Sequence, residues 1–105
     1  MFSFFQMTGN YEDRKVAKDE FDWGFISTVS VNDGRKLFET AVRHPDYNDG
    51  RMVIVACYDT KEAAKKGHAK WVKKMAAAKL PKSLTDCANS EIQQLIGRQK
   101  FPRKE

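Results

Sequence analysis

The stretch "RMVIVACYDTKEAAKKGHAKWVKKM", Arg51 to Met75, decides the fold because the period of its apolar residues changes at Asp59. Before Asp59, apolar side chains occupy both alternating faces, which is typical of a buried β-strand. We therefore predict a strand that is central and well covered in its sheet. After Asp59 the apolar residues recur at helical spacing. The helix is predicted to end near Leu80, because Pro81 disfavours helix in the residue before it.

Two features define the predicted helix, its first turn and its apolar stripe. Asp59 is the expected N-cap, with Glu62 three residues later as in a variant capping box. The stripe is expected to pack on the sheet, with Val72 at its edge. Its members are Ala64, Gly67, His68, Trp71, Met75 and Ala78. We assign His68, Trp71 and Met75 to the structural core.

Upstream of this stretch, three further segments have strand-like composition. They are "RKVAKDEF" (14–21), "FISTVSV" (25–31) and "RKLFETAV" (35–42). Turn-forming residues follow the last two, namely "NDG" at 32–34 and "RHPDYNDG" at 43–50. Turns this short favour antiparallel pairing of neighbouring strands.

The remaining chain completes the predicted architecture. A loop is expected over 81–89, and Ser90 can then cap a short helix that Gly97 closes. The fold class is therefore predicted to be α+β, with a three- or four-stranded antiparallel sheet packed by one long helix, plus a short C-terminal helix. At 105 residues, the chain is expected to form a single domain, 1–105, with flexible ends at 1–10 and 98–105.

Composition bears on the cellular setting. No apolar segment approaches the roughly 20 residues that span a membrane. The N-terminus has no basic region before its short apolar run, so no signal peptide is expected. Cys57 and Cys87 lie thirty positions apart, a spacing typical of neither a redox motif nor a disulfide framework. We interpret both as reduced thiols in a cytoplasmic protein that does not associate with membranes.

Positive charge is concentrated on the predicted helix. The chain has a net charge of +5, and residues 60–79 contain seven lysines and one glutamate. At about 100° per residue, four lysines lie opposite the apolar stripe, namely Lys66, Lys70, Lys73 and Lys74. Such a face is either a solvated surface or a binding face for nucleic acid, a nucleotide or an acidic protein. It contains no arginine, and Trp71 is expected to point inward, so it lacks a stacking platform for bases.

His68 is interpreted as a packed core histidine. A second metal ligand would be expected three or four positions later, where the chain has Trp71 and Val72. A nucleophile brought near by the fold, such as Cys57, is the alternative that would indicate an enzyme. Neither a catalytic residue nor a metal or cofactor site is predicted.

The loop 43–50 contains the second histidine. Its acidic and amide residues resemble half of a calcium loop, but the glutamate needed further on is absent. A hairpin connection is therefore predicted. His44 and Tyr47, expected to be exposed at its tip, are candidate partner-binding residues because loops carry function more often than scaffolds do.

Three quoted segments carry a resemblance to a known group of proteins. They are "NYEDRKVA", "FETAVRHPDYNDGRMVIVACYDTKEAAKKGHAKWVKKM" and "LPKSLTD". The combined pattern is an E-T strand, an H-P-x-Y-N-x-G loop, a V-I-V strand, and a helix opened by Y-D-T-K-E-A and containing G-H-x-x-W-V. From about Tyr11 to Leu95, the chain resembles short, mostly uncharacterised proteins of bacteriophages and prophages. It departs from them at Ala56, where an acidic residue is common, and in its helix lysines.

The resemblance implies a phage setting and transfers no catalytic residue to this chain. Small phage proteins act mainly by binding, as modulators of host machinery or defence or as minor virion components. The expected partner is a host or phage protein in the bacterial cytoplasm. Nucleic acid or an anionic nucleotide, bound through the lysine-rich face of helix 60–79, is the alternative. A homo-oligomer is a further alternative, because Phe2, Phe4 and Phe5 could pack on the sheet or on another subunit.

Overall fold

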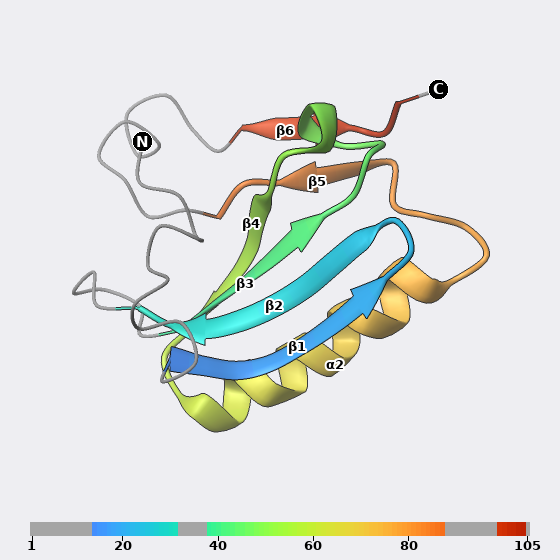
Figure 1. Cartoon of the computed structure of the whole chain (residues 1–105). Helices are drawn as coiled ribbons and strands as arrows, with labels where there is room; N and C mark the ends of the chain where they lie inside the picture. Colours follow the sequence, from blue (N-terminus) through green and yellow to red (C-terminus); the bar gives the residue numbers. More distant parts are fainter. Residues whose placement is uncertain (1–13, 32–37, 88–98, 105) are drawn as a thin grey trace.

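Four antiparallel strands in chain order form the main sheet of the computed structural model, which describes residues 14–31, 38–87 and 99–104 (Figure 1). They are β1 (Lys15–Phe21), β2 (Gly24–Ser30), β3 (Phe38–Arg43) and β4 (Val53–Tyr58). Each strand pairs with the next, in the order β1-β2-β3-β4. The α+β class is confirmed, with four strands as the outcome. The predicted turn at 32–34, the short helix at 90–97 and the N-terminal phenylalanines lie outside the described residues.

Helix α2 (Lys61–Ala76) packs across one face of this sheet (Figure 1). Its N-cap is Thr60, whose hydroxyl accepts a hydrogen bond from the Ala63 backbone N–H at 3.0 Å. The prediction of Asp59 as N-cap was wrong by one residue. The predicted end near Leu80 was also wrong, and Ala78 is exposed beyond the helix. Beyond Met75 only small alanines and a lysine follow, so little packing supports further helical turns.

A second, two-stranded sheet lies beside β4. It consists of β5 (Ser83–Thr85) and β6 (Lys100–Pro102), paired antiparallel. The sequence predicted a loop and a flexible end for these two segments, so both strands are corrections. The Cys87 backbone N–H donates to the Ile54 carbonyl oxygen at 2.6 Å, which holds the chain after β5 along β4.

This arrangement also corrects the predicted place of β4, which ends the strand order and is not central. The apolar side chains on both faces of β4 nevertheless pack against other apolar residues, because each face belongs to one of two core clusters. On the helix side the buried cluster consists of Ile26, Val42, Tyr47, Val53, Val55, Met75 and Leu84. On the opposite side Val29 and Ala41 pack with Val31, Met52 and Ile54. Within the described ranges, no helix has the length and apolar character needed to cross a membrane.

Candidate functional site

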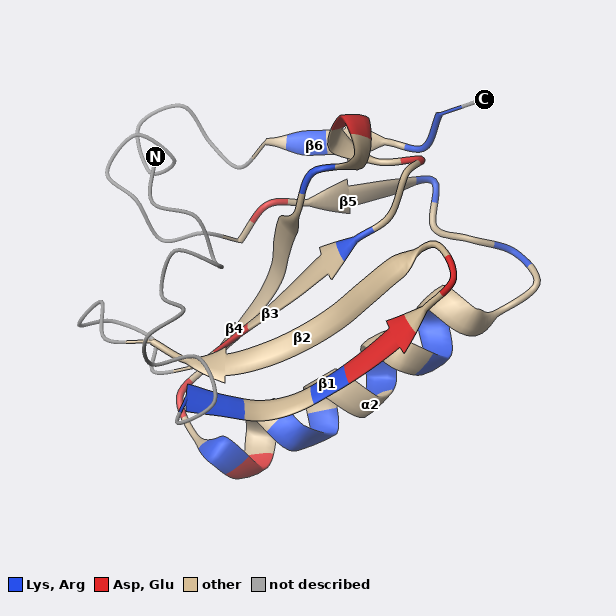
Figure 2. Cartoon of the chain, in the orientation of Figure 1, with Lys and Arg blue, Asp and Glu red and all other residues tan. Residues whose placement is uncertain are grey.

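The outer surface of α2 carries the lysines singled out from the sequence. All four side chains are exposed, as their angular positions predicted: Lys66, Lys70, Lys73 and Lys74. We call these four residues the lysine face. Figure 2 shows basic residues along the length of α2 and acidic residues at the end of the neighbouring strand β1. The single acidic residue of the helix, Glu62, lies 3.7 Å from Lys66, and both side chains are largely exposed. Such a surface pair contributes little to stability and leaves the face strongly basic.

Trp71 lies at the border between the lysine face and the core. Its ring packs against the helix-side cluster but stays half-buried. The Lys74 ammonium is 4.4 Å from the ring centroid, a cation–π arrangement. The expectation that Trp71 is turned wholly away from the lysines was therefore wrong.

His68 is buried, with 4% of its surface exposed, and both ring nitrogens have partners. Nε2 donates to Asp19 Oδ2 of β1 at 2.7 Å, and Nδ1 lies 2.7 Å from Thr28 Oγ1 of β2. The imidazole thus joins the helix to two strands. This confirms the interpretation of His68 as a packed core histidine with polar partners.

The hydrogen bonds continue beneath the helix as a chain of hydroxyl groups. Thr28 Oγ1 lies 2.5 Å from Thr40 Oγ1, which is 3.3 Å from the Tyr58 hydroxyl. Both threonines are fully buried. Each has one hydroxyl proton, so the direction of the whole chain depends on which nitrogens of His68 carry protons. Among the described residues, no buried side-chain nitrogen or oxygen lacks a partner.

Asp19, His68 and Thr28 are arranged in the order of a catalytic triad, but the hydroxyl group is not accessible to a substrate. In a triad the carboxylate orients the imidazole, which activates a hydroxyl nucleophile. Here the Thr28 hydroxyl is covered on all sides, so a substrate carbonyl cannot reach it. The sequence did not reveal Asp19 or Thr28. The one available indication was the run of Ser and Thr residues in the otherwise apolar strand β2.

Gly67, the neighbour of His68, permits close packing of α2 on the sheet. It is buried, and a Cβ atom at this position would overlap the Tyr58 ring. Tyr58 in turn contacts Thr40 at the end of the hydroxyl chain. The Gly-His pair therefore has a structural explanation: glycine admits the tyrosine ring, and histidine satisfies the polar groups beside it.

The two loop candidates, His44 and Tyr47, are buried, which corrects the expectation that they are exposed at the loop tip. His44 packs between Trp23 and Tyr47, with ring centroids 4.7 and 5.4 Å away. Its Nδ1 accepts the Asp46 backbone N–H at 3.0 Å. Burial lowers the pKa of His44 from its ordinary value, and the Asp46 carboxylate opposes this effect.

Tyr47 connects the same loop to the segment before β5. Its hydroxyl donates to the Pro81 carbonyl oxygen at 2.5 Å. The loop can fold back in this way because Asn48 and Asp49 adopt positive φ angles of 52° and 55°. These values confirm that the turn-forming residues tolerate left-handed backbone here. His44 and Tyr47 thus complete the core, whereas Pro45 and Asp49 of the same loop are exposed.

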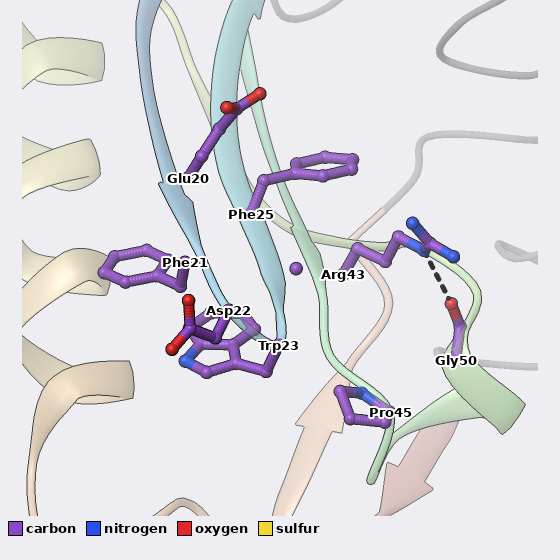
Figure 3. A pocket seen from close by; sticks show the side chains of 9 residues that line it. Glu20, Phe21, Asp22, Trp23, Phe25, Arg43, Pro45 and Gly50 are labelled. Atoms are coloured by element: carbon purple, nitrogen blue, oxygen red, sulfur yellow. Dashed lines mark hydrogen bonds between the residues drawn. The ribbon is translucent and has the colours of Figure 1, made fainter.

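A pocket of about 510 Å³ lies beside the turn between β1 and β2 (Figure 3). Glu20, Phe25 and Arg43 form one row across β1, β2 and β3. Arg43 Nε donates to the Gly50 carbonyl oxygen at 3.0 Å, and Glu20 is 3.0 Å from Lys18. The charges around Phe25 are therefore of both signs and are engaged with neighbouring groups. No residue of the lysine face lines this pocket.

Comparison with known proteins finds no relative of this chain. Protein-family models, curated proteins and solved structures were each searched, and none matches this chain. Within the described part of the chain, no three His, Cys, Asp or Glu side chains are grouped so as to hold a metal ion. The lysine face with Trp71 at its border is the candidate site that the geometry favours.

Proposed function

We propose that the protein acts by binding an acidic macromolecule through the lysine face of α2, and not by catalysis. The observation that carries this proposal is the exposure of four lysines on one side of a helix whose other side is fixed to a sheet. Like charges at i, i+3 and i, i+4 spacing repel by a few tenths of a kcal/mol per pair, and packing of the helix tolerates this. An acidic partner would relieve the repulsion on contact.

A protein is the partner class that we place first. Lysine presents a flexible point charge, which suits the scattered carboxylates of an acidic protein surface better than bidentate recognition of phosphate. Complementary charge also accelerates the encounter of two proteins. The resemblance to bacteriophage and prophage proteins supports a host or phage protein as the partner, in the cytoplasm of the bacterial cell. An accessory role, modulating host machinery or defence or serving in the virion, follows from the same resemblance.

Nucleic acid or an anionic nucleotide is the second candidate, favoured by one observation. Trp71 is half-buried and has Lys74 over its ring, so an aromatic side chain borders the lysine face. A base could stack there after displacing the lysine, while the remaining lysines neutralise phosphates. This candidate predicts a binding constant that falls steeply with added salt.

A role without catalysis is supported by the surroundings of the polar core. The groups that could act together as base and nucleophile, His68 and Thr28, are buried and bonded to each other. Their hydrogen bonds hold α2 on the sheet, which is a structural use of the same chemistry.

The test is a charge reversal on the lysine face with a matched control. Lys66→Glu with Lys70→Glu changes the face, whereas Lys82→Glu with Lys100→Glu makes the same change in net charge at exposed lysines near β5 and β6. Tagged versions of the three proteins are used to capture partners from infected host cells, with mass spectrometry of bound proteins and nucleic acid. We expect the face variant to lose the partner and the control to keep it. Equal capture by all three proteins would refute the proposal.

A further inference from the structure

Cys57 and Cys87, thirty positions apart in the sequence, lie side by side in the fold. Cys57 is near the end of β4, and Cys87 follows β5 by two residues. The Cys57 thiol donates to the carbonyl oxygen of Cys87 at 3.2 Å. The Cys87 thiol in turn donates to the Val55 carbonyl oxygen at 3.1 Å. Each sulfur is thus held against the backbone of the segment that carries the other.

The backbone contact between the two segments brings the two cysteines close to each other. The Cys87 N–H donates to the Ile54 carbonyl oxygen at 2.6 Å, as between neighbouring strands about 4.8 Å apart, and this bond places Cys87 beside Ile54 and Val55, shortly before Cys57 in β4. Disulfides join Cα atoms that are about 4.4–6.8 Å apart. Both cysteines are half-buried, which leaves a small oxidant access to the sulfurs. Rotation of the two thiols away from their carbonyl acceptors, with a small shift of the segment after β5 along β4, would let the sulfurs meet.

We propose that Cys57 and Cys87 are a modification site, a dithiol that a peroxide oxidises to a reversible intramolecular disulfide. One thiolate attacks the peroxide, the O–O bond breaks, and a sulfenic acid and hydroxide form. The second thiolate then attacks the sulfenic sulfur and expels hydroxide, which leaves as water. The two sulfurs are oxidised by two electrons in total. One hydrogen peroxide is reduced to two waters, which take up the two thiol protons.

The bond would change how the two sheets are joined. It would link β4 to the chain after β5 and enclose all of α2 in the cross-linked loop. Cross-linking residues this far apart restricts the unfolded chain and stabilises the native state. The oxidised protein would therefore keep the segment after β5 fixed on β4, whereas the reduced protein relies on backbone and thiol hydrogen bonds there.

The experiment treats the purified full chain with hydrogen peroxide, blocks remaining thiols by alkylation, and records intact mass and thermal unfolding. We expect a loss of about 2 Da, a peptide cross-link between Cys57 and Cys87, and a melting temperature several degrees higher. Dithiothreitol should reverse all three changes. Cys57→Ser and Cys87→Ser, which retain a hydroxyl donor, should gain about 16 Da or form dimers instead.

Two results would overturn the proposal. One is a wild-type protein that behaves like the single serine variants, with sulfenic acid or dimers and no internal cross-link. The other is an internal cross-link that leaves the melting temperature unchanged or lowers it, because the bond would then join unfolded or distorted chains.

Discussion

The ammonium group of Lys74 lies 4.4 Å from the centroid of the Trp71 ring, so the lysine face and the core meet at one aromatic side chain. We expect Trp71→Ala to lower the free energy of unfolding by about 2–3 kcal/mol. This is less than the ~3–5 kcal/mol of a fully buried tryptophan, because the ring is half-buried. In a double-mutant cycle with Lys74→Ala, urea denaturation should give a coupling energy of about 0.5–1 kcal/mol. Lys73→Ala, one position away, is the control and should show no coupling with Trp71.

The hydrogen bonds of His68 should contribute more to the stability of the fold than to any binding activity. His68→Gln is expected to lower the free energy of unfolding by about 1–3 kcal/mol, because the buried Thr28 hydroxyl loses one of its two partners. Asp19→Asn should cost less than about 1 kcal/mol, since its side chain is half-exposed and water can replace the contact. Chemical denaturation of both variants checks the order. Equal losses would mean that the Asp19 contact, and not the hydroxyl chain, dominates.

His44 should make the protein less stable in acid. Burial lowers its pKa in the folded state, so the unfolded chain binds a proton there more readily. Neutral His44 stabilises the folded protein fully above the pKa of the unfolded chain, about 6.5. This stabilisation is lost as the pH falls through the lower pKa of His44 in the folded protein. We expect the free energy of unfolding to drop less between pH 7.5 and 5.5 in His44→Asn than in the wild type. Identical pH dependence in both proteins would show that protonation of His44 does not lower the free energy of unfolding.

Gly67→Ala should destabilise the protein although alanine is the better helix former. Alanine favours helix by about 1 kcal/mol, but overlap with the Tyr58 ring is expected to cost about 1–3 kcal/mol. The net loss should be seen as a lower melting temperature. Tyr58→Leu removes the ring, and in that background Gly67→Ala should become neutral or stabilising. A stabilising Gly67→Ala in the wild type would indicate that Tyr58 moves aside freely.

β4 and α2 were predictable because their apolar residues recur with a local period, and the other three strands of the main sheet were predictable from strand-like composition and from turn residues. Periods of two and of 3.6 are properties of the local sequence, and the turn residues between the strands reinforce them. The short strands β5 and β6 were not predictable in this way. Each has three residues, and each depends on a partner strand whose paired residues are 15 to 19 positions away, so no local pattern marks it.

The candidate site was only partly visible in the sequence. The exposure of the four lysines followed from their angles around the helix. The burial of His44 and Tyr47 did not, because it depends on how the loop folds back at Asn48 and Asp49. Likewise, the partners of His68 come from strands 40 and 49 positions earlier, which no spacing rule connects to a helix. The N-cap was predicted one residue too early, because Asp59 and Thr60 are both good capping residues and the backbone conformation at Thr60 decides between them.

The contact between Asp19 and His68 joins residues 49 positions apart, whereas the four strands of the main sheet pair only with their neighbours in the chain. Successive hairpins can form early during folding, because their loops close at little entropic cost. Docking of α2 on β1 must wait until the intervening strands are in register. The imidazole–carboxylate bond should therefore be absent from the folding transition state. Its removal should accelerate unfolding and leave the refolding rate almost unchanged, so this bond prolongs the native state by the small factor that a contribution below about 1 kcal/mol allows.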